Sequence, residues 1–230
     1  MRCLRTRIGR AQKVDRPLHD WMVPVLYQQD RYTPLPAASG NGDAIAELRD
    51  RVRRAQESSD SVSDPKNVPL FGFPEIGRFG FLGRDHDLLV LERALRNNTA
   101  VLLRGMGGVG KTQLATHLAG WLHRIGGIRA AWFTSFEQRT DRARIVNAVG
   151  LNLAGVKFLS LPREQADEIV LEFLREQPCL LVWDNFESSR GFPRGHPPTV
   201  RPEDQDDLVR LVRELDGGAT RVLVTSRTDE

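Results

Sequence analysis

Cysteine is scarce in this chain of 230 residues, which contains only Cys3 and Cys179. So few cysteines exclude a disulfide framework of the kind that stabilises small secreted domains. Cys179 stands inside an apolar run, so we expect its thiol to be buried and unreactive.

Long apolar runs are missing as well. No stretch approaches the roughly 18 consecutive apolar residues that a membrane-spanning helix needs. The arginine-rich start, residues 1–13, lacks the apolar core of a secretory signal. With 40% hydrophobic and 27% charged residues, the composition is ordinary for a globular protein. We therefore expect no membrane partner and a cytoplasmic location.

A basic stripe and metal-ligand spacing are both lacking. The formal net charge is +3, and residues 1–36 alone hold seven Lys or Arg against three Asp. The remainder is close to neutral, so we do not expect nucleic acid as a partner. The five histidines show no metal-ligand spacing, and His117 and His123 lie on different faces of one expected helix. We expect these imidazoles to be packed or exposed.

Glycine, in contrast, is concentrated in one short segment, residues 105–112. Residues 105–112 satisfy the phosphate-loop pattern G-x-x-x-x-G-K-[ST], between an apolar run and a helical pattern. The glycines let backbone N–H groups wrap round a polyphosphate. Lys111 is placed to reach the β- and γ-phosphates, and the hydroxyl of Thr112 to bind Mg²⁺. The residues expected to bind nucleotide here are Gly105, Met106, Gly107, Gly108, Val109, Gly110, Lys111, Thr112 and Gln113.

Composition divides the chain into three parts. Residues 1–36 are mixed and basic, with an apolar patch at 21–27 that predicts a strand with no obvious partner in the chain. Residues 37–68 are rich in Gly, Ser, Asp and Ala and are typical of a linker, apart from a polar helical stretch at 43–56. Residues 69–230 alternate between strand-like and helix-like stretches, which predicts an α/β domain with a parallel sheet covered by helices.

The expected elements of this third part follow from its periodicity. An amphipathic helix includes Leu88, Leu89, Leu91 and Leu95. A second helix follows the phosphate loop and stops at Gly126 and Gly127. The expected strands cover 100–103, 128–136, 179–183 and 221–225, the further helices 139–154, 162–176 and 202–215, and a surface loop 191–202.

Two strand ends carry candidate chemistry. The strand at 179–183 leads into Asp184, at the edge where ligands bind in open α/β sheets, so Asp184 is a candidate Mg²⁺ ligand. Asn185 follows, where hydrolysing relatives often have an acid, and an amide is a poor general base. Glu187 can replace that acid if the chain turns inward, but a solvated loop acid is the expectation. The last expected strand ends at Arg227, where a planar cation can distinguish ATP from ADP.

Together these motifs resemble the STAND class of signalling NTPases, which includes the NB-ARC domains. Residues 81–85 are similar to the first motif of that class, 105–112 to its phosphate loop, 180–185 to its second nucleotide motif and 223–227 to its sensor strand. The resemblance covers about residues 70–228. It implies a three-layer P-loop NTPase fold, ATP or ADP with Mg²⁺, and Arg227 as sensor arginine. It also places Leu82 and Arg84 on the adenine and ribose side, and the sensor strand between the phosphate-loop and Asp184 strands.

The chain also departs from that class. The class continues with a fifth strand, a helical module, a winged helix and sensing repeats, so we expect a fold that is incomplete at the C-terminus. The strand at 100–103 would then be an open edge, which promotes self-association. Residues 19–27 resemble the end of a caspase-like CHAT domain, so 1–36 are either the tail of an upstream domain or a disordered basic segment. His19 and Cys3 are not a catalytic dyad.

The sequence therefore predicts a nucleotide switch with slow ATP hydrolysis at most. Its expected partners are nucleotide, further copies of the chain and other signalling proteins. Two alternatives stay open: a scaffold or regulatory fragment that does not hydrolyse ATP, and an AAA+-like ATPase acting on nucleic acid. A partition ATPase is excluded because it carries a lysine where this chain has Met106.

Overall fold

The computed structural model describes residues 25–28, 70–75, 81, 83–192 and 195–227. In this part of the chain six strands form one sheet, in the order β1-β3-β6-β5-β4-β2. They are β1 (Val25–Gln28), β2 (Leu70–Phe71), β3 (Ala100–Arg104), β4 (Ala130–Ser135), β5 (Cys179–Asp184) and β6 (Arg221–Ser226). Strands β2 to β6 are parallel, and β1 pairs antiparallel with β3.

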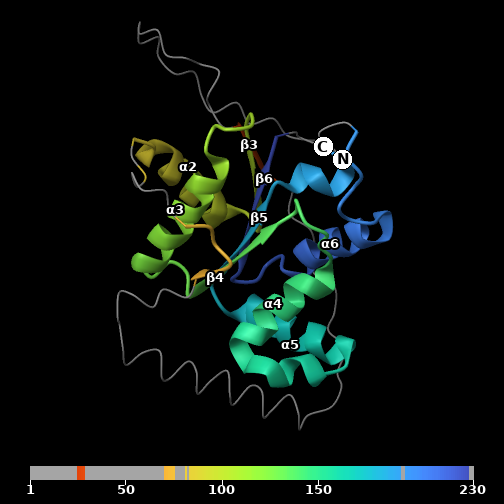
Figure 1. The fold of residues 1–230 in the computed structure, drawn as a ribbon. Coiled ribbons are helices and arrows are strands. Elements are labelled where there is room, and N and C mark those ends of the chain that lie inside the picture. Colours follow the sequence, from red (N-terminus) through yellow and green to blue (C-terminus); the bar gives the residue numbers. More distant parts are fainter. Residues whose placement is uncertain (1–24, 29–69, 76–80, 82, 193–194, 228–230) are drawn as a thin grey trace, which may run out of the picture.

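Helices cover both faces of the sheet (Figure 1). α2 (Asp85–Asn97) and α3 (Lys111–Arg124) pack on one face, and α4 (Arg142–Ala154), α5 (Arg163–Glu176) and α6 (Pro202–Glu214) pack on the other. Two short 3₁₀ helices, η2 (Gly155–Ser160) and η3 (Phe186–Arg190), follow α4 and β5. This is the three-layer α/β fold of P-loop NTPases that the sequence predicts. The predicted order, with β6 between β3 and β5, is confirmed.

Burial explains the central strand and the helix after the phosphate loop. Every residue of β5 is buried, because Cys179, Leu181 and Trp183 face one core and Leu180 and Val182 the other. This is the unbroken apolar run that a strand covered on both faces requires. The apolar stripe of α3 is buried in full, at Leu114, Ala115, Leu118, Ala119 and Leu122.

Helix ends follow local chemistry. α4 begins later than the expected residue 139, because the Asp141 side chain accepts a hydrogen bond from the backbone N–H of Arg144 at 2.8 Å and caps the helix. α3 ends where Gly126 adopts φ +72° and Gly127 donates its backbone N–H to the carbonyl of Leu122 at 2.8 Å. The predicted stop at these two glycines is confirmed.

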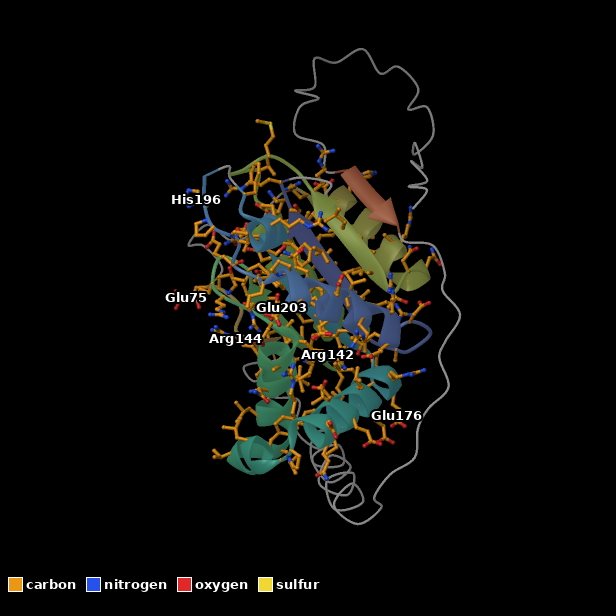
Figure 2. All side chains as sticks on the ribbon, turned by 90° about the vertical axis from the view of Figure 1, so that its right-hand side faces the viewer. Glu75, Arg142, Arg144, Glu176, His196 and Glu203 are labelled. Atoms are coloured by element: carbon orange, nitrogen blue, oxygen red, sulfur yellow. The ribbon has the colours of Figure 1, made fainter. Side chains whose placement is uncertain are left out.

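Arg142 joins the three helices on one face. It lies where α4, α5 and α6 meet (Figure 2), with ion pairs to Asp167 at 2.9 Å and Glu214 at 2.7 Å. Its side chain is 9% exposed, so both acids neutralise a buried cation. The helical layer is therefore fixed by a charge cluster as well as by apolar packing.

One expectation about the start of the chain is wrong. The predicted strand near residues 21–27 does have a partner in this chain, since β1 pairs with β3 in the register Val25 to Arg104 and Gln28 to Val101 (Figure 2). The expected open edge at β3 is therefore covered. The rest of residues 1–36, the linker 37–68 with its helical stretch, and Leu82 lie outside the described residues. Within the described part, no helix has the length and apolar character that a membrane span requires.

Candidate nucleotide-binding site

The phosphate loop connects β3 to α3. Gly108 and Gly110 have φ +80° and +84°, a left-handed conformation that favours glycine. A Cβ atom on Gly107 would lie 3.4 Å from Cζ of Arg227, so this glycine allows a close approach to the arginine. The backbone N–H of Gly105 donates to the carbonyl of Ser226 at 3.1 Å. The loop is thus tied at its start to the end of β6.

Lys111 lies inside this loop. Its Nζ donates to the carbonyl oxygens of Gly105 at 2.7 Å and Met106 at 3.1 Å. Burial lowers the pKa of Lys111; Glu187 and Asp184 oppose that shift, while the charge of Arg227 adds to it. The ammonium group therefore lies among charges of both signs at the carboxyl end of the parallel strands.

A hydroxyl–carboxylate cluster joins α3, β5 and β6. Asp184 ends β5 and is 3% exposed. Oγ1 of Thr112 lies 2.9 Å from Oδ2 and 3.0 Å from Oδ1 of Asp184, and donates to this carboxylate. Oγ1 of Thr225 donates to Oδ1 of Asp184 at 2.6 Å and accepts the backbone N–H of Asn185 at 3.1 Å. Carboxylate and hydroxyl oxygens are the ligands that Mg²⁺ prefers, so Thr112 and Asp184 fit that ion.

The chain turns sharply after Asp184. Asn185 has φ +55° and is the only non-glycine residue with positive φ among those described. The turn leads into η3 and brings Glu187 back inside, where it is 4% exposed. Its Oε1 pairs with Nε of Arg227 at 3.1 Å, while its buried Oε2 has no hydrogen-bond partner in the described chain. The expectation that Glu187 is a solvated loop acid is wrong.

Arg84 is bound to the phosphate loop. Its Nη1 donates to the carbonyl of Val109 at 2.8 Å, and its Nε donates to Oδ2 of Asp87 at 2.7 Å. The guanidinium therefore supports the loop from the side of α2. The predicted role of Arg84 toward ribose stays a prediction.

Other predicted residues lie around this centre. Met106 is 62% exposed at the tip of the loop, and Val109 and Gln113 are partly buried. His117 stacks on Phe81 with ring centroids 4.4 Å apart, and burial lowers the pKa of this histidine. It is thus a packed imidazole, and the described residues contain no group of three or more His, Cys, Asp or Glu that could hold a metal ion.

One contributor was missed from the sequence, and a second, Glu187, was named but expected in solvent. Thr225 was given no role, although its position at the carboxyl end of a strand next to β5 is a signal for a site residue. The inward direction of Glu187 depends on the left-handed turn at Asn185, which periodicity cannot predict. An asparagine directly after a buried strand was the available signal, since Asn tolerates that conformation.

The arrangement suits a nucleotide with its magnesium ion. A Cβ on Gly108 would meet no atom within 4 Å, while Gly107 and Gly110 lie next to the guanidinium groups of Arg227 and Arg84, and α3 begins at Lys111 with its positive end toward the loop. Arg227 lies against the same loop. Chemically, the site can bind an anion and a divalent ion. The buried carboxylate of Glu187 lies close to both positions.

Comparisons with known proteins return likenesses among solved structures only. No protein-family model and no curated protein matches the chain. The chain is similar to the Cdc6p structure from Pyrobaculum aerophilum at 19% identity, covering 74% of this chain and 43% of that one, with a TM-score of 0.44. It is also similar to the structure of Drosophila ORC bound to DNA. The identity is 16%, the match covers 88% of this chain and 48% of that one, and the TM-score is 0.45. It is similar to the Aeropyrum pernix ORC2 protein, in ADPNP–ADP complexes, at 18% identity, covering 71% of this chain and 43% of that one, with a TM-score of 0.42.

This chain spans less than half the length of each of these structures. The likenesses concern the fold alone. That the chain has a P-loop NTPase fold rests on its own phosphate loop and strand order.

Proposed function

We propose that the chain is the nucleotide-binding switch module of a STAND-type signalling NTPase, which binds ATP or ADP with Mg²⁺. The observation that carries the proposal is the convergence of Lys111, the Thr112–Asp184 pair and Arg227 on one glycine loop. These groups come from α3, β5 and β6, which are far apart in sequence. Each has the chemistry that one part of a magnesium nucleotide requires.

The roles divide as follows. Lys111 and the N-terminus of α3 bind the phosphates, and Arg227 contacts the terminal phosphate. Thr112 and Asp184 hold Mg²⁺, which neutralises phosphate charge when bound. The adenine and ribose roles of Leu82 and Arg84, and the preference for adenine over guanine, rest on the family resemblance.

Hydrolysis is slow in this proposal. Water attacks the γ-phosphorus, a carboxylate accepts its proton, and the bond to the β–γ bridging oxygen breaks to give ADP and phosphate. Asn185, the residue directly after Asp184, is an amide and cannot accept that proton. ATP then favours an assembled form that meets signalling partners, and ADP a closed one.

Calorimetry with Mg²⁺–ATP and Mg²⁺–ADP tests the binding site. Lys111→Ala should lower the affinity for ATP at least about tenfold, which corresponds to ~1.4 kcal/mol of binding free energy. The matched control is Arg163→Ala, which removes an exposed cation from the start of α5 and should leave affinity unchanged. Equal ATP affinity in the wild type and in Lys111→Ala would show that the loop is not the site. A parallel titration with GTP tests the preference for adenine.

The alternatives predict other results. Steady turnover near 10 s⁻¹, the middle of the enzyme range, would contradict a slow switch. Tight binding with no measurable hydrolysis would favour a scaffold. The Drosophila structure compared above is a DNA complex, so fluorescence anisotropy with single- and double-stranded DNA measures the nucleic-acid alternative. Salt-dependent binding at sub-micromolar DNA would favour it.

A further inference from the structure

Four ionisable side chains meet at the carboxyl end of the sheet: Lys111, Asp184, Glu187 and Arg227. Asp184 and Glu187 are buried, as is Lys111, and Arg227 closes the group from the solvent side with 41% of its side chain exposed. The two acids balance the two bases. A ligand that brings further negative charge next to Arg227 therefore competes with the acids for that cation.

Glu187 is the incompletely paired member. One of its oxygens pairs with Arg227, and the other is buried without a hydrogen-bond partner in the described chain. A carboxylate in that position depends strongly on its remaining cation. The Lys111 ammonium is a second nearby cation, since the charge of Glu187 opposes the lowering of the pKa of Lys111 by burial.

Arg227 lies against two parts of the site, Glu187 and the phosphate loop. Its Nε pairs with Glu187, while its Cζ lies 3.4 Å and its Nη1 3.5 Å from where a Cβ on Gly107 would be. The guanidinium therefore lies between a buried acid and the loop proposed to hold phosphates. Within the described residues, Glu187 is its only ion-pair partner.

We propose that Glu187 and the terminal phosphate of ATP compete for Arg227, so that Glu187 sets the preference between ATP and ADP. This inference rests on the proposed nucleotide function. Arg227 changes partner when a γ-phosphate is present, and Glu187 then keeps the attraction of Lys111. ADP has no γ-phosphate and leaves the Glu187–Arg227 pair intact. Glu187 is thus a positioning residue, which makes ATP binding weaker than it would otherwise be.

The test measures affinities for a non-hydrolysable ATP analogue and for ADP by calorimetry, which separates binding from turnover. Glu187→Gln keeps the shape of the side chain and removes its charge. It should therefore raise the affinity for the ATP analogue about three- to tenfold and change the affinity for ADP less than twofold. Arg227→Gln should lower the affinity for the ATP analogue and leave the affinity for ADP unchanged. Glu187→Gln in the Arg227→Gln background should have no further effect on ATP, because no arginine is left to release.

The matched control is Glu176→Gln, since Glu176 is exposed at the far end of α5 (Figure 2). It should change neither affinity. If Glu187→Gln does not fold, Glu187→Asp shortens the side chain and weakens the pair with its charge retained; it should shift the ATP-to-ADP affinity ratio in the same direction.

Different results overturn the proposed function and the competition for Arg227. A wild-type chain that binds neither nucleotide overturns the proposed function. A wild-type chain that binds both through Lys111, with an ATP-to-ADP ratio unchanged by Glu187→Gln and by Glu187→Asp, overturns the competition and leaves the function standing.

Discussion

Asn185 has a backbone conformation that few side chains tolerate, and it directs the chain after β5. With φ +55° it lies in the left-handed region, which costs most L-residues about 1–2 kcal/mol. Its backbone N–H is held by Thr225 at 3.1 Å. The position of Glu187 beside Arg227 therefore depends on what Asn185 permits.

Substitution at residue 185 separates backbone strain from chemistry. Asn185→Ala should lower the free energy of unfolding by about 1 kcal/mol, and Asn185→Gly by much less, because glycine adopts positive φ freely. Asn185→Asp tolerates the turn and restores a carboxylate, so it should raise ATP hydrolysis if this position faces the attacking water. Urea unfolding and phosphate release are the measurements. Equal stability of the Ala and Gly variants would contradict the strain.

Cys179 gives a prediction about alkaline pH. The expected burial of Cys179 is confirmed, and this burial raises the pKa of its thiol from 9.0 to about 12. Above pH 9 the unfolded thiol loses its proton while the folded one keeps it, so stability falls as pH rises from 9 toward 12. Cys179→Ala should show a smaller loss of stability between pH 8.5 and 10.5, measured by urea unfolding. The same slope in both proteins would refute this.

The candidate site could be predicted where one residue's chemistry decides its role. Lys111, Thr112 and Asp184 have positions fixed by a loop, a helix start and a strand end, all visible as patterns. The sequence names Glu187 as a candidate but does not decide its direction, because that depends on the left-handed turn at Asn185. Arg84 shows the same limit: a motif names the residue, but only packing shows that it donates to Val109.

Helical glycines show what packing adds at the scale of an element. In α4, a Cβ on Gly150 would lie 2.2 Å from the ring of Phe158, which is buried in η2. In α3, a Cβ on Gly120 would meet only Cδ1 of Leu70 at 3.8 Å. The two glycines have the same helical propensity and opposite surroundings.

Gly150→Ala should therefore destabilise the chain, by about 1–3 kcal/mol for overpacking, although alanine favours helices. Gly120→Ala is the matched control and should stabilise by up to about 1 kcal/mol. Thermal unfolding of both variants tests the pair. A higher melting temperature for Gly150→Ala would mean that Phe158 moves away at little cost.

Periodicity predicted the elements between residues 85 and 226 well, because each helix has one apolar face and each inner strand two. Ends shifted by a few residues where a cap such as Asp141 decided the start. β2 and β1 were harder. A two-residue strand has no period, and the pairing of β1 with β3 joins segments separated by more than seventy residues.

For the whole molecule, β1 changes what we expect of association. β3 feeds the phosphate loop and is covered by β1, with Val25 opposite Arg104, the residue before Gly105. The expected self-association through an open β3 edge does not apply while this pairing persists. An uncovered edge strand would present unpaired backbone groups.

Removal of residues 1–28 should expose that edge, so association should rise with protein concentration and affinity for ATP should fall. Removal of residues 1–24 keeps β1 and serves as the control. Light scattering after size-exclusion chromatography, at increasing concentration, measures the mass. A truncated 29–230 chain that stays monomeric, with unchanged ATP affinity, would show that β1 does not protect β3.

The burial of β5 between two cores has a consequence for amide exchange with deuterium. The amides of Leu180 to Trp183 are in a central strand that both layers of helices cover, so no local opening reaches them without separating a layer from the sheet. Their exchange should be the slowest in the chain and should report global unfolding. Because Asp184 directly follows these amides, the end of the site that we propose to hold Mg²⁺ is attached to the strand expected to exchange most slowly, and the surrounding loop is expected to exchange much faster.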